Sequence, residues 1–251
     1  MVVLTSALVS GCGESGSSSN DNSGSSSGST SSSDAEEEQE QEETEPEAKV
    51  EDVAWEVGEP IFTVWTDSID SRWIQVMVPV TNTGAKNLYY DEVQLDIEDA
   101  EGHLIESMDL LSFYPQIIQP GETGWVYEET TFESESEPGN VITHIDFSEA
   151  KAECIRFDVS DLDIRGDEYG GITVTGRVEN TTDEEQSMIE IVAFLYDENN
   201  ILIGRASDTL SSLKAGEKVG FSATSFSLPD SVSFEAIANY EVVAYPFQFQ
   251  W

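Results

Sequence analysis

The chain has 251 residues, of which 51 are Asp or Glu and only 10 are Lys or Arg, so its formal net charge is −41. Such an acidic chain lacks the cationic face that a protein needs to bind nucleic acids or anionic lipid headgroups. Its two His and two Cys lie far apart, which excludes a Cys/His zinc cluster and a disulfide framework. A content of 38% apolar residues is nevertheless enough for a folded core.

Residues 1–11 form a short apolar segment that we expect to be the end of a signal peptide. The segment is too short to span a bilayer, and no base precedes Lys49, so we expect the basic start of the signal peptide to lie upstream. Residues 8–12, LVSGC, resemble the lipobox of prokaryotic lipoproteins. This resemblance implies that the peptide is cleaved before Cys12 and that the Cys12 thiol carries a diacylglycerol. We therefore expect an anchor on the extracytoplasmic face of the cell membrane.

Residues 12–49 have the composition of a disordered linker. Residues 13–33 are almost entirely Ser, Gly and Asn, and residues 34–47 hold nine carboxylates and no base. Flexible-coil scaling gives this tether a reach of roughly 30–36 Å, and charge repulsion extends it further. We expect the tether to lift a domain clear of the lipid surface. An acidic tail that binds a cationic partner is the alternative.

From residue 50 onward the sequence alternates between apolar and polar residues in short runs, which predicts strands at 73–80 and 171–178. A shift of 98 residues superposes these two runs. Over 74–107 against 172–205, nine of 34 positions are identical, where chance would give about two. The sequence therefore predicts an internal duplication, with one copy over 50–152 and the second over 153–251.

Both copies show the same order of strands and turns. The first strand ends in Val-x-Asn-Thr, where Asn82 or Asn180 can close a turn through its side chain. A second strand then runs to Asp99 or Asp197, at which a hairpin turn leads into a return strand. Further strands are expected over 123–132 and 218–226. Strands of this length and spacing predict an all-β fold of two tandem immunoglobulin-like antiparallel sandwiches.

The second copy resembles the FxLYD domain of prokaryotic surface lipoproteins over about residues 155–245. The resemblance depends on GxVxNT at 176–181, LYD at 195–197 and AGE at 215–217. At one signature position Ala193 replaces the family's Phe, and Phe194 follows it. The first copy looks like a diverged relative. The resemblance implies a sandwich in a secreted or lipid-anchored protein and carries no established catalytic residues.

The sequence offers no recognisable catalytic motif, and we expect no enzyme and no cofactor. His103 and His144 have no Ser or Cys nucleophile in a recognisable elbow, and no H-E-x-x-H occurs. Asp161, Asp163 and Asp167 lie at the junction of the copies with Asp158 and Glu168, and their spacing begins like an EF-hand loop. The pattern fails where a bidentate Glu is needed. A solvated acidic face is therefore favoured over calcium.

Four tryptophans, at positions 55, 65, 73 and 125, are concentrated in the first copy. Exposed aromatic rings could stack on sugars or peptides, whereas Trp65 and Trp73 flank predicted strands where a sandwich needs large core residues. We favour core filling. Cys154 has no partner once Cys12 is lipidated, and we expect it to be a buried free thiol near the first strand of the second copy.

These features together predict a non-catalytic, lipid-anchored surface protein. Its two modules would bind or scaffold an envelope or extracellular protein or glycan, with the membrane contacted only through the anchor. The alternative is an adhesion or capture protein that binds a glycan or peptide on an exposed aromatic face of the first sandwich. A contiguous exposed aromatic patch would favour the alternative. Of the net charge, −29 belongs to residues 53–251, with 38 acids and 9 bases, so the sandwiches themselves are acidic.

Overall fold

The structure is a computed structural model that describes residues 51–248, apart from 110–111, 169, 226–227 and 230–231. The predicted signal peptide, the lipid attachment at Cys12 and the linker to residue 49 lie outside the described residues. The described part is almost entirely antiparallel β-structure, with one 3-10 turn, η1 (Phe234–Ala236), as its only helix. The predicted all-β sandwich fold is confirmed. No helix in these ranges has the length and apolar character needed to cross a bilayer.

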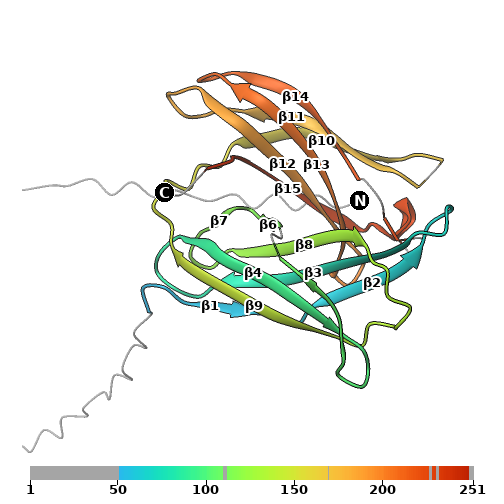
Figure 1. The fold of residues 1–251 in the computed structure, drawn as a ribbon. Helices are drawn as coiled ribbons and strands as arrows, with labels where there is room; N and C mark the ends of the chain where they lie inside the picture. Colours follow the sequence, from blue (N-terminus) through green and yellow to red (C-terminus); the bar gives the residue numbers. More distant parts are fainter. Residues whose placement is uncertain (1–50, 110–111, 169, 226–227, 230–231, 249–251) are drawn as a thin grey trace, which may run out of the picture. The chain divides into compact units, whose positions relative to one another are not determined.

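The first half, residues 51–150, contains two antiparallel sheets (Figure 1). One has the order β1-β3-β8-β6, with β2 also paired to β3, and the other contains β5, β7 and β9 paired to the central β4. The strands are β1 (Trp55–Val57), β2 (Ile61–Thr66), β3 (Arg72–Asn82), β4 (Leu88–Glu98), β5 (Leu104–Met108), β6 (Ser112–Tyr114), β7 (Ile117–Ile118), β8 (Thr123–Thr131) and β9 (Asn140–Glu149).

The second half, residues 151–248, forms one sheet in the order β10-β11-β14-β13-β12-β15. Only the pair Ser207 and Thr224 joins β13 to β14, so the sheet folds there into two layers around one core. The strands are β10 (Asp158–Gly166), β11 (Ile172–Glu179), β12 (Gln186–Tyr196), β13 (Leu202–Leu213), β14 (Lys218–Thr224) and β15 (Asn239–Pro246).

The strands of the two halves follow the offset seen in the sequence. The bounds of β4 and β12 differ by 98 residues at both ends, and β5 and β13 begin 98 residues apart. The offset becomes 95 residues at the starts of β8 and β14, as expected after a three-residue deletion. The halves differ at one place. The second half has the long strand β13, whereas the first half has three short strands, β5, β6 and β7, because β6 pairs with β8 in the other sheet.

A buried asparagine closes the same corner in each half. Asn82 and Asn180 are both fully buried, and each side-chain amide donates two hydrogen bonds to backbone carbonyl groups. The acceptors are Lys86 and Ile118 for Asn82, and Glu184 and Leu213 for Asn180, all at 2.8–3.0 Å. The side-chain oxygen of each accepts from the backbone N–H two residues later. The predicted side-chain turn is thus confirmed in both halves.

One type of hairpin loop occurs four times in the described chain. In each loop an aspartate carboxylate accepts from the backbone N–H four residues later at 2.8 Å, and the third residue after the aspartate has a positive φ of 61–86°. The four aspartates are Asp67, Asp99, Asp167 and Asp197. The hairpins predicted at two of them are confirmed. The pKa values of Asp99 and Asp197 are lowered chiefly by the backbone N–H four residues later, and that of Asp67 chiefly by a hydrogen bond from the Trp73 indole.

Each half has its own apolar core, and the expectation that Trp65 and Trp73 belong to it is wrong. Because side chains alternate along β3, the core residues Ile74 and Val76 place Trp73 on the outer face of the sheet. There the half-buried rings of Trp65 and Trp73 stack at 5.9 Å, and the Trp73 indole donates to Asp67 at 2.9 Å.

Cys154 is a free thiol, but it is half-buried in the segment before β10 and not inside a strand. Its sulfur accepts a hydrogen bond from the Gln119 amide at 3.4 Å. Burial raises the pKa of the Cys154 thiol, which keeps the thiol protonated and unreactive at neutral pH.

Candidate functional site: a cleft between the two halves

The outer faces of the two halves contact each other through a separate apolar cluster. Its buried members are Met77 and Tyr127 from the first half and Val192, Phe194, Tyr196 and Leu202 from the second. Alternate residues of β12 face the core of the second half, and the residues between them face this cluster. The strand is therefore apolar on both sides, which explains the nearly continuous apolar run at 189–196.

Arg205 of β13 crosses this contact and lies against two aromatic rings of the first half. Its guanidinium carbon is 4.7 Å from the ring centroid of Tyr114 and 4.7 Å from that of Tyr127. The Nε atom is buried and has no hydrogen-bond partner in the described part of the chain. The positive charge of Arg205 also opposes the rise in pKa that burial causes at Glu128.

A short polar chain lies beneath the same face. The Gln75 amide donates to the Tyr127 hydroxyl at 2.7 Å, and this hydroxyl donates to Glu129 at 3.0 Å. Burial raises the pKa of Tyr127 far above its usual value, so the phenol remains a hydrogen-bond donor. These contacts hold Tyr127 in place under Arg205.

A second polar contact joins the halves near the start of β8. Arg156 donates to both carboxylate oxygens of Glu122, at 3.0 and 3.1 Å, and to the backbone carbonyl of Ile117. The Gln116 side chain accepts from the backbone N–H of Gln248 at 2.8 Å. The apolar cluster, Arg205 and Arg156 together attach one half to the other.

Between these contacts lies a cleft of about 430 Å³, within the size range of small-molecule pockets. The first half contributes Pro115, Glu122, Thr123 and Trp125, and the second contributes Phe194, Tyr196, Asn200, Glu241 and Val243. The Trp125 indole lies close enough to the Tyr196 hydroxyl to oppose the rise in pKa that burial causes there. The cleft therefore has aromatic and aliphatic walls and two carboxylates.

The two carboxylates of the cleft differ in their partners. Glu122 is neutralised by Arg156 and also accepts from the backbone N–H of Gln119 at 2.7 Å. Glu241 lies at the exposed rim, and its carboxylate has no hydrogen bond or ion pair among the described residues. Partial shielding from water by its neighbours, followed by repulsion from Glu122, raises the pKa of Glu241. Burial and the Glu241 charge raise the pKa of Tyr196 to about 12. Of the two carboxylates of the cleft, Glu241 is the one whose charge is not compensated.

The structure separates the tryptophans that the sequence suggested as one aromatic surface. Trp125 lines the cleft, Trp55 packs against Phe147 at 5.5 Å, and the other two form the stacked pair on β2 and β3. No tryptophan belongs to the large apolar side chains that are exposed in the described ranges. Part of the outer face of the sheet that contains β3 and β8 contacts the second half.

The two histidines do not form a nucleophile–base pair with their neighbours. His144 and Ser107 both bind the carboxylate of Asp96, at 3.1 and 2.6 Å, and no hydrogen bond joins them to each other. His103 pairs with Asp99 of its own hairpin and is largely exposed. A catalytic Ser–His arrangement needs the base to contact the nucleophile, and this cluster does not show that contact.

The aspartates considered for calcium do not converge on one point. Asp161 and Asp163 belong to β10, at a bulge where Asp161 has a positive φ of 55°, and they pair with Arg177 at 3.9 Å and Arg165 at 2.7 Å. The Asp167 carboxylate accepts a backbone hydrogen bond inside its hairpin. Across the described residues, no group of three or more Asp, Glu, His or Cys side chains has a geometry that could hold a metal ion.

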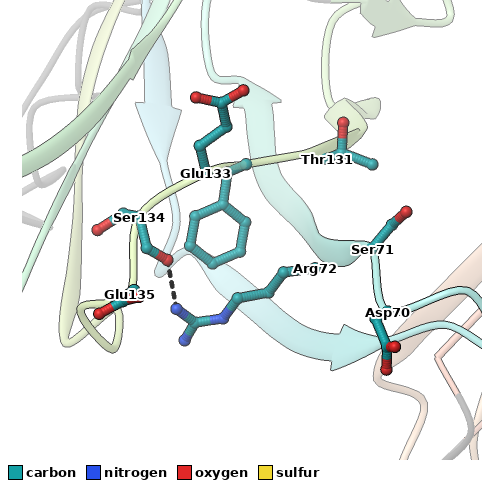
Figure 2. Close-up of a pocket in the computed structure, with 8 residues that line it drawn as sticks. Asp70, Ser71, Arg72, Thr131, Glu133, Ser134 and Glu135 are labelled. Atoms are coloured by element: carbon teal, nitrogen blue, oxygen red, sulfur yellow. Dashed lines mark hydrogen bonds between the residues drawn. The ribbon is translucent and has the colours of Figure 1, made fainter.

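A hollow of about 760 Å³ beside Arg72 is larger than the cleft, but the one base that lines it is already paired. Figure 2 shows the Arg72 guanidinium directed at the backbone carbonyl of Ser134. Arg72 also pairs with Glu137 at 2.6 Å and lies 4.6 Å from the centroid of the Phe132 ring. It therefore fastens the segment after β8 to the sheet, and the cleft is the stronger candidate.

Sequence reasoning identified Trp125 but missed Arg205, Tyr114 and Glu241. The available signal was the run at 189–196, where a strand that is apolar on both sides requires a second covering surface. No protein-family model matches the chain, and no curated protein matches it. The resemblances to the lipobox and to the FxLYD domain therefore stay predictions.

Proposed function

We propose that this chain is a non-catalytic, lipid-anchored cell-surface protein whose two immunoglobulin-like modules act as one binding or scaffolding body in the cell envelope. The observation that supports this proposal is the contact between the outer faces of the two modules. Both modules bury aromatic and aliphatic side chains against each other, so the pair behaves as a single unit at the end of a tether.

The proposed anchor depends on the N-terminal sequence. The LVSGC segment ends in Cys12, and a Ser/Gly-rich stretch and an acidic stretch follow immediately. Two acyl chains hold a protein on a membrane far longer than one, because each buried methylene contributes about 0.8 kcal/mol. The acidic surface of the modules would then keep them away from an anionic lipid or wall surface.

The position of the aromatic side chains limits where an adhesion or capture protein of this kind could bind its ligand. A glycan-binding platform needs an open aromatic face, and the corresponding face of the first sandwich packs on the second half. Of the two hollows described above, the cleft is the one that a tryptophan of the first sandwich lines. Capture of a ligand would therefore use both modules.

The anchor is tested with the Cys12→Ala variant of the full chain, expressed behind a complete signal peptide in a bacterium that processes lipoproteins. We expect the wild type in the membrane fraction, labelled by radioactive palmitate, and the variant released and unlabelled. Cys154→Ala is the matched control and should behave like the wild type, because Cys154 lies between β-strands far along the chain. Membrane retention of Cys12→Ala at the wild-type level would refute the anchor.

A further inference from the structure

The cleft between the halves contains an acidic group, Glu241, that no cation among the described residues pairs with. Of the two bases that join the halves, Arg156 is engaged by Glu122, and Arg205 lies against Tyr114 and Tyr127. Glu241 has no ion-pair partner within the described residues. A partly desolvated carboxylate without a partner costs stability, which a cation from another molecule would recover.

The walls of the cleft are suited to the rest of a cationic side chain. Trp125 and Tyr196 present aromatic surface, and Pro115 and Val243 present aliphatic surface. Aromatic rings attract ammonium and guanidinium groups through their electron-rich faces. The aliphatic stem of such a side chain can lie along apolar surface while its charged end reaches a carboxylate.

We propose that the cleft binds a basic side chain, the ammonium of a lysine or the guanidinium of an arginine, presented by a partner protein. Its charge pairs with Glu241 at the rim, and its stem lies against Trp125 and Tyr196. This inference gives a ligand chemistry to the binding role proposed above and rests on that role. It does not depend on the lipid anchor, because the cleft is formed entirely within residues 115–243.

The acidity of the whole chain supports a basic partner but does not by itself select the cleft. A net charge of −41 attracts cations to the entire surface. A specific site differs from this general attraction in two ways. It prefers a cation over a neutral group of similar size, and its affinity depends on one carboxylate more than on the others. The experiment measures both differences.

The test uses the full chain with ¹⁵N-labelled tryptophan and follows the indole N–H signal of Trp125, assigned with Trp125→Phe. Three probe peptides are added at one ionic strength of about 0.15 M: acetyl-Gly-Lys-Gly-amide, acetyl-Gly-Arg-Gly-amide and the neutral acetyl-Gly-Gln-Gly-amide. We expect saturable shifts with the Lys and Arg peptides and none with the Gln peptide. Equal shifts with all three, or no shift with any, would overturn the proposal.

The variant that decides the site is Glu241→Gln, which keeps the shape of the side chain and removes its charge. It should weaken the Lys peptide about tenfold or more, as expected for loss of a hydrogen bond to a charged group. The matched control, Glu101→Gln in the β4–β5 hairpin, removes the same charge from an exposed position and should bind like the wild type. If both variants weaken binding equally, the peptides bind to the general acidic surface and the cleft is not a site.

Failure of this test would not affect the proposed location of the protein. The membrane fractionation of Cys12→Ala reports only on the lipid anchor, and the indole N–H signal of Trp125 reports only on binding in the cleft. A protein that is anchored but does not bind the peptides would remain a surface scaffold without this ligand.

Discussion

Replacement of Arg205 tests whether the two halves form one body. The guanidinium of Arg205, from the second half, lies 4.7 Å from the ring centroids of both Tyr114 and Tyr127 of the first half. Arg205→Ala removes the charge, the aliphatic stem and the buried Nε–H group together. Arg205→Met keeps most of the stem and removes the charge and the N–H.

The expected effect on the free energy of unfolding follows from two opposing contributions. A desolvated cation–π contact is worth about 2 kcal/mol, so two contribute about 4 kcal/mol. The buried Nε–H has no partner in the described residues, and such a group costs about 1–3 kcal/mol. Arg205→Ala should therefore destabilise the chain by about 1–3 kcal/mol. Arg205→Met should destabilise the chain less than Arg205→Ala, because the Met side chain keeps apolar contact with the rings and its sulfur recovers about 0.3–1.5 kcal/mol against an aromatic ring.

Equilibrium urea unfolding of the full chain, followed by tryptophan fluorescence, measures this difference. Wild type should unfold in one transition, and Arg205→Ala should unfold at lower urea, with a second transition if the halves separate. Arg177→Ala is the control, because Arg177 makes only a long, exposed ion pair with Asp161 at 3.9 Å and should cost less than about 0.5 kcal/mol. An Arg205→Ala effect as small as this control would refute the reasoning.

Two further predictions concern a buried amide and an uncompensated carboxylate. Asn82→Ala and Asn180→Ala should each lower the free energy of unfolding by about 2–4 kcal/mol, because each leaves two buried carbonyl groups without a donor. Urea unfolding measures this loss, with Asn140→Ala at an exposed position as the control. Losses no larger than that of the control would contradict the role of the two buried asparagines. The pKa of Glu241 is raised above its ordinary 4.5, so the unfolded state binds fewer protons and the charged side chain costs stability above that pH. Glu241→Gln should then be more stable than wild type at pH 7, with a smaller advantage near pH 4, and equal stability at pH 7 would contradict the assignment.

The β-structure of this protein could be predicted to a large extent because its signals are local. Alternation of apolar and polar residues placed β3, β11 and β12, and the end of β4, close to their observed bounds. The turns at Asp99, Asp197, Asn82 and Asn180 were also predictable. In each, a short polar side chain bonds to backbone within a few residues.

The position of the aromatic side chains could not be predicted in the same way. Alternation shows that Trp73 and Ile74 point to opposite faces, but it does not show which face is the core. Trp73 was assigned to the core and lies on the outer face, in a stack with Trp65. Size and apolar character alone do not distinguish a core residue from one that packs on another surface.

The sequence by itself determined that the chain is an all-β protein with a repeated pattern of strands and turns, because these features depend on neighbouring residues. Only the tertiary structure decided that β12 is covered on both sides, that Arg205 lies between two tyrosines of the other half, and that Trp125 and Glu241 share a cleft. These contacts join residues far apart in the chain, such as Trp125 and Glu241, which are 116 positions apart. They depend on which outer faces complement each other in shape and polarity, and no local pattern records that choice.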